Sequence, residues 1–336
     1  MNIDIRNLKP NKVSYNWNSQ SIAIFGQVKT GKSTFMYDLL GQDALFLACE
    51  NGLEALPGVV YQRVYSVSDI KEVLYQLEDI LDQDGSLPFK SIVFDTVNAF
   101  EDMCVSYVLG QNGITDMSQL GHGKAYVALD KVIKDILNQI LRLSLGVHFV
   151  GHVKVKKVED KINRVEYEKF VPSISERVQK IILADCYFMP FMFNKLDEQG
   201  NEHRMMAFRD TTQWLSGTRY KYMPPFTPLN VEAFKNAVNN AIKAEEEAKK
   251  GSTTTEAKTT EKKVLDFKAI MAKGSELGAQ IQGAGHVDKL MEMVTETLGV
   301  DENGKPRMFN QLKESQVETA HILVMKLERL AKELGL

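Results

Sequence analysis

The chain has 336 residues, enough for one large domain and a second, smaller one, because a typical domain has about 100 to 200 residues. Hydrophobic residues make up 44% of the sequence and charged residues 25%, which is an ordinary composition for a globular protein. The formal net charge of -3 excludes a general attraction to nucleic acid or anionic lipid, so any polyanion binding requires a local basic patch.

The cysteine content and the hydropathy pattern set the expected compartment. Cys49, Cys104 and Cys186 are too few and too scattered for a disulfide framework or a four-ligand zinc site, so we interpret them as buried small apolar residues in a reducing compartment. No apolar run approaches the about 20 residues that span a bilayer. The N-terminal stretch MNIDIRNLKPNK lacks the apolar core of a signal peptide. We therefore expect a cytoplasmic protein with no membrane partner.

After an N-terminal arm (1–20), short apolar runs alternate with amphipathic helical patterns over residues 21–229. Helical spacing is clearest over 69–82 and 125–145. The strand-like runs are SIAIF, ALFLACE, SIVFD, GVHFVGH and ADCYFMPFMF. This alternation is typical of βαβ units, and continuous apolar runs suit strands that are covered on both faces. The pattern predicts an α/β core with a mostly parallel central sheet flanked by helices.

The rest of the chain has a different character. A helix is predicted over residues 230–250, and it is followed by a Thr-, Lys- and Glu-rich stretch without apolar periodicity over 251–263. This composition favours a flexible linker. Helical spacing returns over 264–336 and predicts a small domain of about three helices, with nothing in it that resembles a catalytic motif.

The most specific motif begins where the first predicted strand ends. Gly26 to Ser33 fit the pattern G-x-x-x-x-G-K-[ST] at every fixed position, and TFMYDLL continues as a helix. The glycines let the main-chain N–H groups turn toward phosphate oxygens, Lys32 neutralises the β and γ phosphates, and the Ser33 hydroxyl ligates Mg²⁺. We therefore predict an ATP and Mg²⁺ site made by Gly26, Gln27, Val28, Lys29, Thr30, Gly31, Lys32, Ser33 and Thr34.

Two carboxylates are candidates for the hydrolytic chemistry. Asp95 ends the run SIVFD, where an acidic residue would hold the Mg²⁺ hydration shell together with Ser33; the alternative role is a cap of the next helix. Many ring ATPases carry a Glu directly after this Asp, but Thr96 follows here, so the general base must come from another strand. Glu50 ends ALFLACE and is the leading candidate, with a helix N-cap or a solvated strand end as the alternative.

A histidine ends a further predicted strand. His152 closes GVHFVGH at the same carboxyl edge, where ligands bind in such sheets. A hydrogen-bonding side chain at this point would sense the γ-phosphate and pass its presence to the following loop. The alternative is a structural histidine whose hydrogen bonds are satisfied locally.

At these four points the chain resembles the RecA-type recombinase core: a P-loop, a strand closing in Glu50-Asn51-Gly52, a strand closing in Asp95-Thr96, and a strand closing in a polar sensor before a basic loop. More narrowly it is similar to the compact, RecA-core-only single-strand annealing ATPases of bacteriophages, which share the E-N-G-L segment and an H-G-K-x-Y segment, here within 121–126. The resemblance covers about residues 20–229. It implies that Glu50 is the water-activating base, Asp95 the Mg²⁺ partner and His152 the switch, a position that Gln occupies in RecA.

The same resemblance implies partners. It implies two mobile DNA-contacting loops, one between Met103 and Lys124 and one after His152. It also implies homo-oligomers with ATP at the subunit interface, where basic residues of a neighbour complete the site. Arg219 and Lys221 are the candidates for this trans-acting role, with plain surface charges as the alternative. If a phage encodes the protein, its compartment would be the host cytoplasm.

The basic segment after His152 is the sequence evidence for DNA binding. Basic residues exceed acidic ones between Val153 and Lys180, and Tyr167 and Phe170 would stack on unpaired bases. A solvated hairpin without a ligand is the alternative. The candidate DNA-binding residues are Lys154, Lys156, Lys157, Lys161, Arg164 and Lys169. The C-terminal unit would dock a single-strand-binding protein, or serve only in oligomerisation or solubility.

These observations favour an ATPase stimulated by DNA, a single-stranded DNA-binding protein of phage-type homologous recombination or strand annealing. A RecA-type helicase or motor of DNA replication would use the same residues. A P-loop kinase or a nucleotide switch is the third hypothesis, and the absence of an acceptor-binding constellation or an arginine-rich lid in the sequence disfavours it.

Overall fold

The computed structural model describes residues 13, 15–160, 164–248, 265–300 and 304–336. The chain divides into two compact units, residues 1–262 and 263–336. The predicted linker (251–263) and most of the predicted arm (1–20) lie outside the described residues. None of the helices in the described ranges combines the length and the hydropathy that a bilayer crossing needs.

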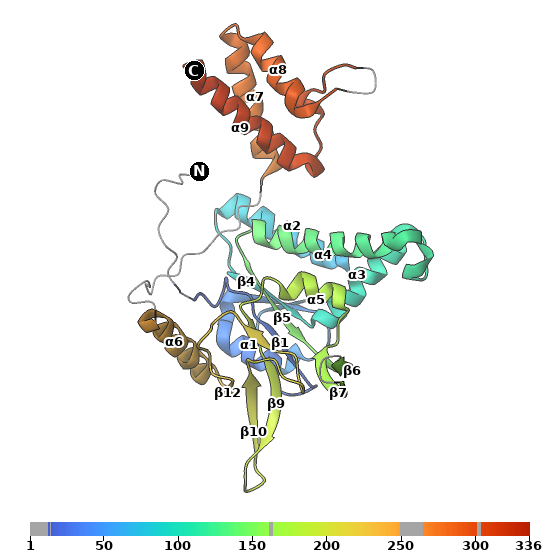
Figure 1. Cartoon of the computed structure of the whole chain (residues 1–336), viewed down its shortest axis with the longest axis vertical. Coiled ribbons are helices and arrows are strands. Elements are labelled where there is room, and N and C mark those ends of the chain that lie inside the picture. Colours follow the sequence, from blue (N-terminus) through green and yellow to red (C-terminus); the bar gives the residue numbers. More distant parts are fainter. Residues whose placement is uncertain (1–12, 14, 161–163, 249–264, 301–303) are drawn as a thin grey trace. The chain divides into compact units, whose positions relative to one another are not determined.

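A mostly parallel sheet forms the centre of the first unit (Figure 1). In the described residues its eight strands lie in the order β12-β10-β9-β1-β5-β4-β2-β3. Neighbours from β3 to β9 are parallel, whereas β10 is antiparallel to both β9 and β12. The α/β prediction is confirmed. The strands are β1 (Ala23–Gly26), β2 (Ala44–Ala48), β3 (Tyr61–Arg63), β4 (Ser91–Asp95), β5 (Gly146–Gly151), β9 (Phe191–Leu196), β10 (Glu202–Ala207) and β12 (Phe226–Pro228).

Helices cover both faces of this sheet, so the apolar strands are buried on both sides. One face packs against α2 (Val67–Asp84), α3 (Val97–Asn112), α4 (Lys124–Arg142) and α5 (Glu176–Leu183). The other face packs against α1 (Lys32–Leu40) and α6 (Val231–Ala248). The parallel strands share one carboxyl edge, and the predicted site residues Asp95, Glu50 and His152 lie at or just beyond the ends of β4, β2 and β5.

Local sequence signals explain where the helices begin and end. The Ser66 hydroxyl accepts a hydrogen bond from the Asp69 amide at 3.2 Å and caps α2, and Gly85 ends the helix in the left-handed conformation. The three predicted helices are present: α2 includes all of 69–82, α4 ends three residues before the predicted end of 125–145, and α6 occupies 231–248 of the predicted 230–250, whose last two residues lie outside the described residues.

The run ADCYFMPFMF was predicted as one strand and forms two. Pro190 separates β8 (Phe188–Met189) from β9, because proline has no N–H to donate to a neighbouring strand. The Pro190 carbonyl instead accepts a hydrogen bond from Phe25 of β1. β8 pairs with β11 (Gly217–Thr218) in a separate two-stranded sheet.

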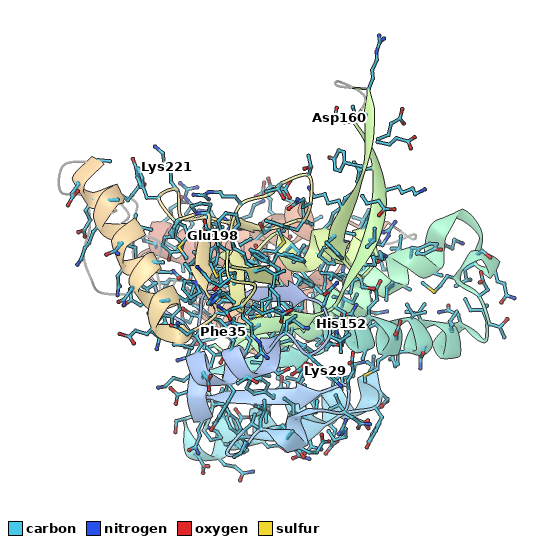
Figure 2. All side chains as sticks on the ribbon, turned by 90° about the horizontal axis from the view of Figure 1, so that it is seen from below. Lys29, Phe35, His152, Asp160, Glu198 and Lys221 are labelled. Atoms are coloured by element: carbon cyan, nitrogen blue, oxygen red, sulfur yellow. The ribbon has the colours of Figure 1, made fainter. Side chains whose placement is uncertain are left out.

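A long antiparallel hairpin follows β5. It consists of β6 (Val153–Asp160) and β7 (Val165–Pro172), which pair along their whole length. Figure 2 shows the hairpin projecting away from the core, with His152 at its base and Asp160 near its tip. At the base, the Ser173 amide donates a 2.8 Å hydrogen bond to the His152 carbonyl, so both ends of the hairpin are joined at the sheet edge.

The second unit is helical and has its own core. It contains α7 (Phe267–Gly283), α8 (Val287–Leu298) and α9 (Val317–Glu333), which bury Ile281, Leu323 and Leu327 between them. α7 and α9 cross closely at Gly274, where a Cβ would lie 2.9 Å from Cγ2 of Val324 in α9. The three helices agree with the sequence prediction.

Candidate nucleotide-binding site

The loop between β1 and α1 has the backbone of a phosphate-binding turn. Gly31 (φ 92°) and Lys29 (φ 62°) both adopt the left-handed conformation, and α1 begins at Lys32 directly after the turn. At the start of the loop, a Cβ on Gly26 would lie 2.9 Å from the Met192 carbonyl oxygen of β9. Both glycines of the motif are therefore required by the backbone, one for its conformation and one for the close approach of a neighbouring strand.

Lys32 points into this loop. Its Nζ donates hydrogen bonds to the carbonyl oxygens of Gly26 (3.2 Å) and Gln27 (2.6 Å), and the residue is only 5% exposed. Burial lowers the pKa of Lys32 to about 8, while the negative charges of Asp95 and Glu50 act in the opposite direction. The ammonium group is thus held where the terminal phosphates of a bound nucleotide would be neutralised.

Asp95 ends β4 beside this lysine. The residue is 7% exposed, and its Oδ2 is buried without a hydrogen-bond partner among the described residues. Burial raises the pKa of Asp95, while a hydrogen bond from Ser33 and the charge of Lys32 oppose that rise. An orphaned carboxylate oxygen next to a hydroxyl fits the Mg²⁺ of P-loop proteins, which is held by few protein ligands and keeps several waters. No cluster of three His, Cys, Asp or Glu side chains suited to a metal occurs in the described ranges.

Glu50 comes to the same edge from β2. Its amide donates to the Asp95 carbonyl, so the ends of β2 and β4 are joined. Its carboxylate accepts a hydrogen bond from the Thr96 hydroxyl and lies 3.2 Å from Nε2 of His152. The His152 hydrogen bond is the largest cause of the lowered pKa of Glu50, followed on the lowering side by that from Thr96. These contacts favour the ionised form of the Glu50 carboxylate, which is the form that can accept a proton.

His152 connects this carboxylate to the hairpin. Its amide donates to Oδ1 of Asn98 at 2.8 Å, and its carbonyl accepts from Ser173. Its Nδ1 is buried and has no partner in the described part of the chain. Thr96 and Asn98 are functional candidates that the sequence analysis missed, although both follow closely after Asp95 at the end of β4.

Comparison with known proteins decides the family. Residues 18–220, more than half of the chain, match the AAA domain family. The chain belongs to this family. Its P-loop ATPase character is therefore shown, whereas the narrower likeness to RecA-type recombinases stays a prediction.

Two known proteins are similar to this AAA protein. It is 22% identical to the SPbeta prophage-derived uncharacterized protein YorG of Bacillus subtilis (strain 168) over 306 residues, which cover 89% of this chain and 91% of the relative. Among solved structures, it is similar to the flagellar accessory protein FlaH of Methanocaldococcus jannaschii. That match has 13% identity and a TM-score of 0.31, and it covers 56% of this chain and 77% of FlaH.

The predicted DNA-binding residues of the AAA protein lie along the β6–β7 hairpin, except Lys161, which is outside the described residues. Two of them are engaged in ion pairs: Lys156 with Glu176, and Lys169 with Asp210 at 2.8 Å. For Lys154, Lys157 and Arg164 no ion pair is found with the described residues, and all three are exposed. These three are the cations of the hairpin that are best placed to meet a phosphate backbone.

The two aromatic residues predicted to stack on bases, Phe170 and Tyr167, have different surroundings in the hairpin. Phe170 was predicted to stack on bases, but it stacks on Phe191 of β9 with ring centroids 5.7 Å apart, and its amide and carbonyl pair with the segment 213–215. The prediction for Phe170 is wrong, because the base of the hairpin packs on the AAA core. Tyr167 lies farther out, opposite Val158, and is half-buried.

The structure also describes the first predicted DNA-contacting loop and the two predicted trans-acting residues. The segment between Met103 and Lys124 was predicted as a mobile loop, but α3 continues to Asn112 because Cys104 and Val108 bury an apolar stripe. Arg219 donates to the carbonyls of Ala184 and Cys186 in its own chain, which favours a structural role. Lys221 lies over the ring of Tyr222 at 5.0 Å. The trans-acting role of Arg219 and Lys221 stays a prediction.

Proposed function

We propose that this AAA protein is an ATP-dependent single-stranded DNA-binding protein of phage-type homologous recombination or strand annealing. The observation that carries the proposal is the continuous connection from Glu50 through His152 to the hairpin. His152 contacts the Glu50 carboxylate with its ring and closes the base of the hairpin with its carbonyl. The site that would hydrolyse ATP and the segment that would hold DNA therefore share one residue.

Each residue at the sheet edge has a distinct proposed task. Lys32 neutralises the terminal phosphates, and Glu50 accepts a proton from the attacking water. A Mg²⁺ held by Ser33, with Asp95 beside it, would supply charge neutralisation for the phosphates. Thr96 and His152 orient the Glu50 carboxylate, because both contact its oxygens directly.

The DNA part of the proposal rests on charge and position. Lys154 and Lys157 lie in β6, which begins directly after His152, so a DNA strand bound to β6 would lie close to the residue that contacts Glu50. Similarity to a prophage-derived protein supports the phage setting. We further propose homo-oligomers with ATP between subunits, completed in trans by Arg219 and Lys221, and a docking role of the C-terminal unit for a single-strand-binding protein.

The test combines ATP turnover with DNA binding. We expect single-stranded DNA to stimulate turnover of the wild-type protein. We expect the Lys154→Ala/Lys157→Ala double variant to lose this stimulation and to reduce the slope of log affinity against log salt by about 1.4, since each lost phosphate contact removes about 0.7 for a single strand. The matched control is Lys131→Ala/Lys243→Ala, which removes the same charge from exposed helix positions outside the hairpin.

The outcomes separate the competing functions. Turnover that is indifferent to DNA, together with a double variant that behaves like its control, would contradict the proposal and favour a kinase or a nucleotide switch. Displacement of a strand from a forked duplex would favour a helicase or motor instead. Annealing of complementary strands without such displacement is the result that we expect.

A further inference from the structure

An arginine from outside the sequence motif lies against the P-loop. Arg204 belongs to β10, and its Nη1 is 3.4 Å from the position that a Cβ on Gly31 would take. Leu229, the residue after β12, approaches the same point with its Cδ2 at 3.6 Å. A cation and an apolar side chain therefore border the loop at the glycine that precedes Lys32.

The main chain holds these two side chains in place. The Leu229 amide donates a 2.9 Å hydrogen bond to the Arg204 carbonyl, and the adjoining residues Met205 and Pro228 are partners in the antiparallel pair of β10 and β12. Asn230 then accepts a hydrogen bond from Ala233 and starts α6. The position of the pair relative to the P-loop is thus fixed by the sheet rather than by a free loop.

The neighbours of Arg204 do not neutralise it. On the same ribbon, Asp197 pairs with His203 at 2.9 Å, and Glu202 accepts from Asn194 at 3.2 Å. Within the described residues, the guanidinium of Arg204 has no hydrogen bond or ion pair. An unpaired arginine beside a phosphate-binding turn is a ready partner for an anion, because its planar fork matches phosphate oxygens.

The strand order says which part of a nucleotide would meet this arginine. Glu50, Asp95 and His152 stand at the ends of β2, β4 and β5, all on one side of β1. The terminal phosphate must lie toward that side, because the proposed general base Glu50 and the Mg²⁺ beside Asp95 would act on it. β9, β10 and β12 lie on the other side of β1, so the rest of a bound nucleotide extends toward them.

We propose that Arg204 binds the phosphate nearest the ribose, and that Leu229 packs against the nucleoside. This inference rests on the proposed nucleotide binding and extends it to residues about 170 and 200 positions beyond the motif. Arg204 acts within its own subunit and is distinct from the trans-acting residues proposed above. It contributes to nucleotide affinity and has no part in proton transfer.

The test is calorimetric binding of MgATP, MgADP and inorganic tripolyphosphate to the full chain. Arg204→Ala is expected to weaken ATP and ADP equally, by about 10- to 100-fold, the range of a lost charge-assisted hydrogen bond. Arg204→Gln, which keeps most of the side-chain length, should show the same loss. Leu229→Ala should weaken the binding of both nucleotides. It should leave tripolyphosphate binding unchanged, because Leu229 contacts the nucleoside and tripolyphosphate has none.

The matched control is Lys195→Ala on β9 of the same ribbon. Lys195 is next to Asn194, the register partner of Arg204, so its side chain points to the opposite face. Its removal should leave all three affinities unchanged. The apo melting temperature of Arg204→Ala should stay close to that of the wild type, because this side chain makes no hydrogen bond or ion pair with the described residues that would be lost.

Four results would overturn the inference. ADP affinity that is unaffected by Arg204→Ala would place the arginine at the terminal phosphate or away from the nucleotide. A large fall in the apo melting temperature would show a structural role. If the wild type binds ATP and Lys32→Ala abolishes that binding while Arg204→Ala does not weaken it, the inference fails and the proposed function stands. If the wild type binds no nucleotide, both fail.

Discussion

The low pKa of Lys32 makes nucleotide affinity depend on pH in an unusual range. Burial in the loop places this pKa at about 8, whereas an exposed lysine titrates above 10. Only the protonated ammonium attracts phosphates, and a bound triphosphate would raise the pKa. Affinity is therefore fully present below pH 8 and falls as pH rises through 8. Between pH 7 and pH 9 the protonated fraction drops about tenfold, which corresponds to about 1.4 kcal/mol of binding free energy.

Equilibrium titration with MgATP at half-unit steps from pH 7 to pH 9.5 measures this effect, because the charge of the nucleotide itself is constant over that range. The control is Lys32→Arg, whose guanidinium stays protonated throughout. Its affinity is expected to be lower in absolute terms but independent of pH. A wild-type affinity that is flat across the range, or an equal slope in Lys32→Arg, would refute the reasoning that burial sets the charge of this lysine.

Two further predictions concern Glu50 and the buried His148. Glu50→Gln should retain MgATP binding and lose hydrolysis by at least about 100-fold, the scale of a general base; substantial turnover in this variant would remove Glu50 from that role. His148 is fully buried, and burial lowers its pKa to about 4, so below its ordinary pKa of 6.5 the unfolded chain binds a proton that the folded chain does not. Lowering the pH from 7 to 5 should therefore cost about 2 kcal/mol of unfolding free energy through this residue. Urea unfolding followed by tryptophan fluorescence reports on the first unit alone, because Trp17 and Trp214 both lie there. His148→Gln should be less stable at pH 7 but lack this increment, and an equal acid loss in both proteins would contradict the assignment.

The parts of the site that could be predicted from sequence are those set by local pattern. The P-loop can be recognised from sequence because its backbone conformation requires glycines at fixed positions. Asp95, Glu50 and His152 can be recognised because each ends an apolar run. Because parallel strands share one carboxyl edge, their convergence followed from the α/β prediction. The structure brings these three side chains together beside Lys32.

The parts that could not be predicted depend on contacts between distant segments. Arg204 reaches Gly31 only because β10 turns back antiparallel beside β9, and nothing near Arg204 in the sequence indicates a phosphate. Phe170 was predicted to stack on unpaired bases because it lies in a basic segment, yet its ring packs on Phe191. In both cases the role of the residue depends on its neighbours in the folded structure, and these cannot be identified from the local sequence.

The position of β5 has a mechanical consequence. This strand is hydrogen-bonded to β1 on one side and to β4 on the other, and a Cβ on Gly151 at its end would lie 2.5 Å from the Phe25 ring. A strand clamped along both margins does not slide without breaking two ladders at once. Under the proposed function, a signal from the nucleotide would therefore reach the β6–β7 hairpin through rotation of side chains such as His152, and not through a shift of β5.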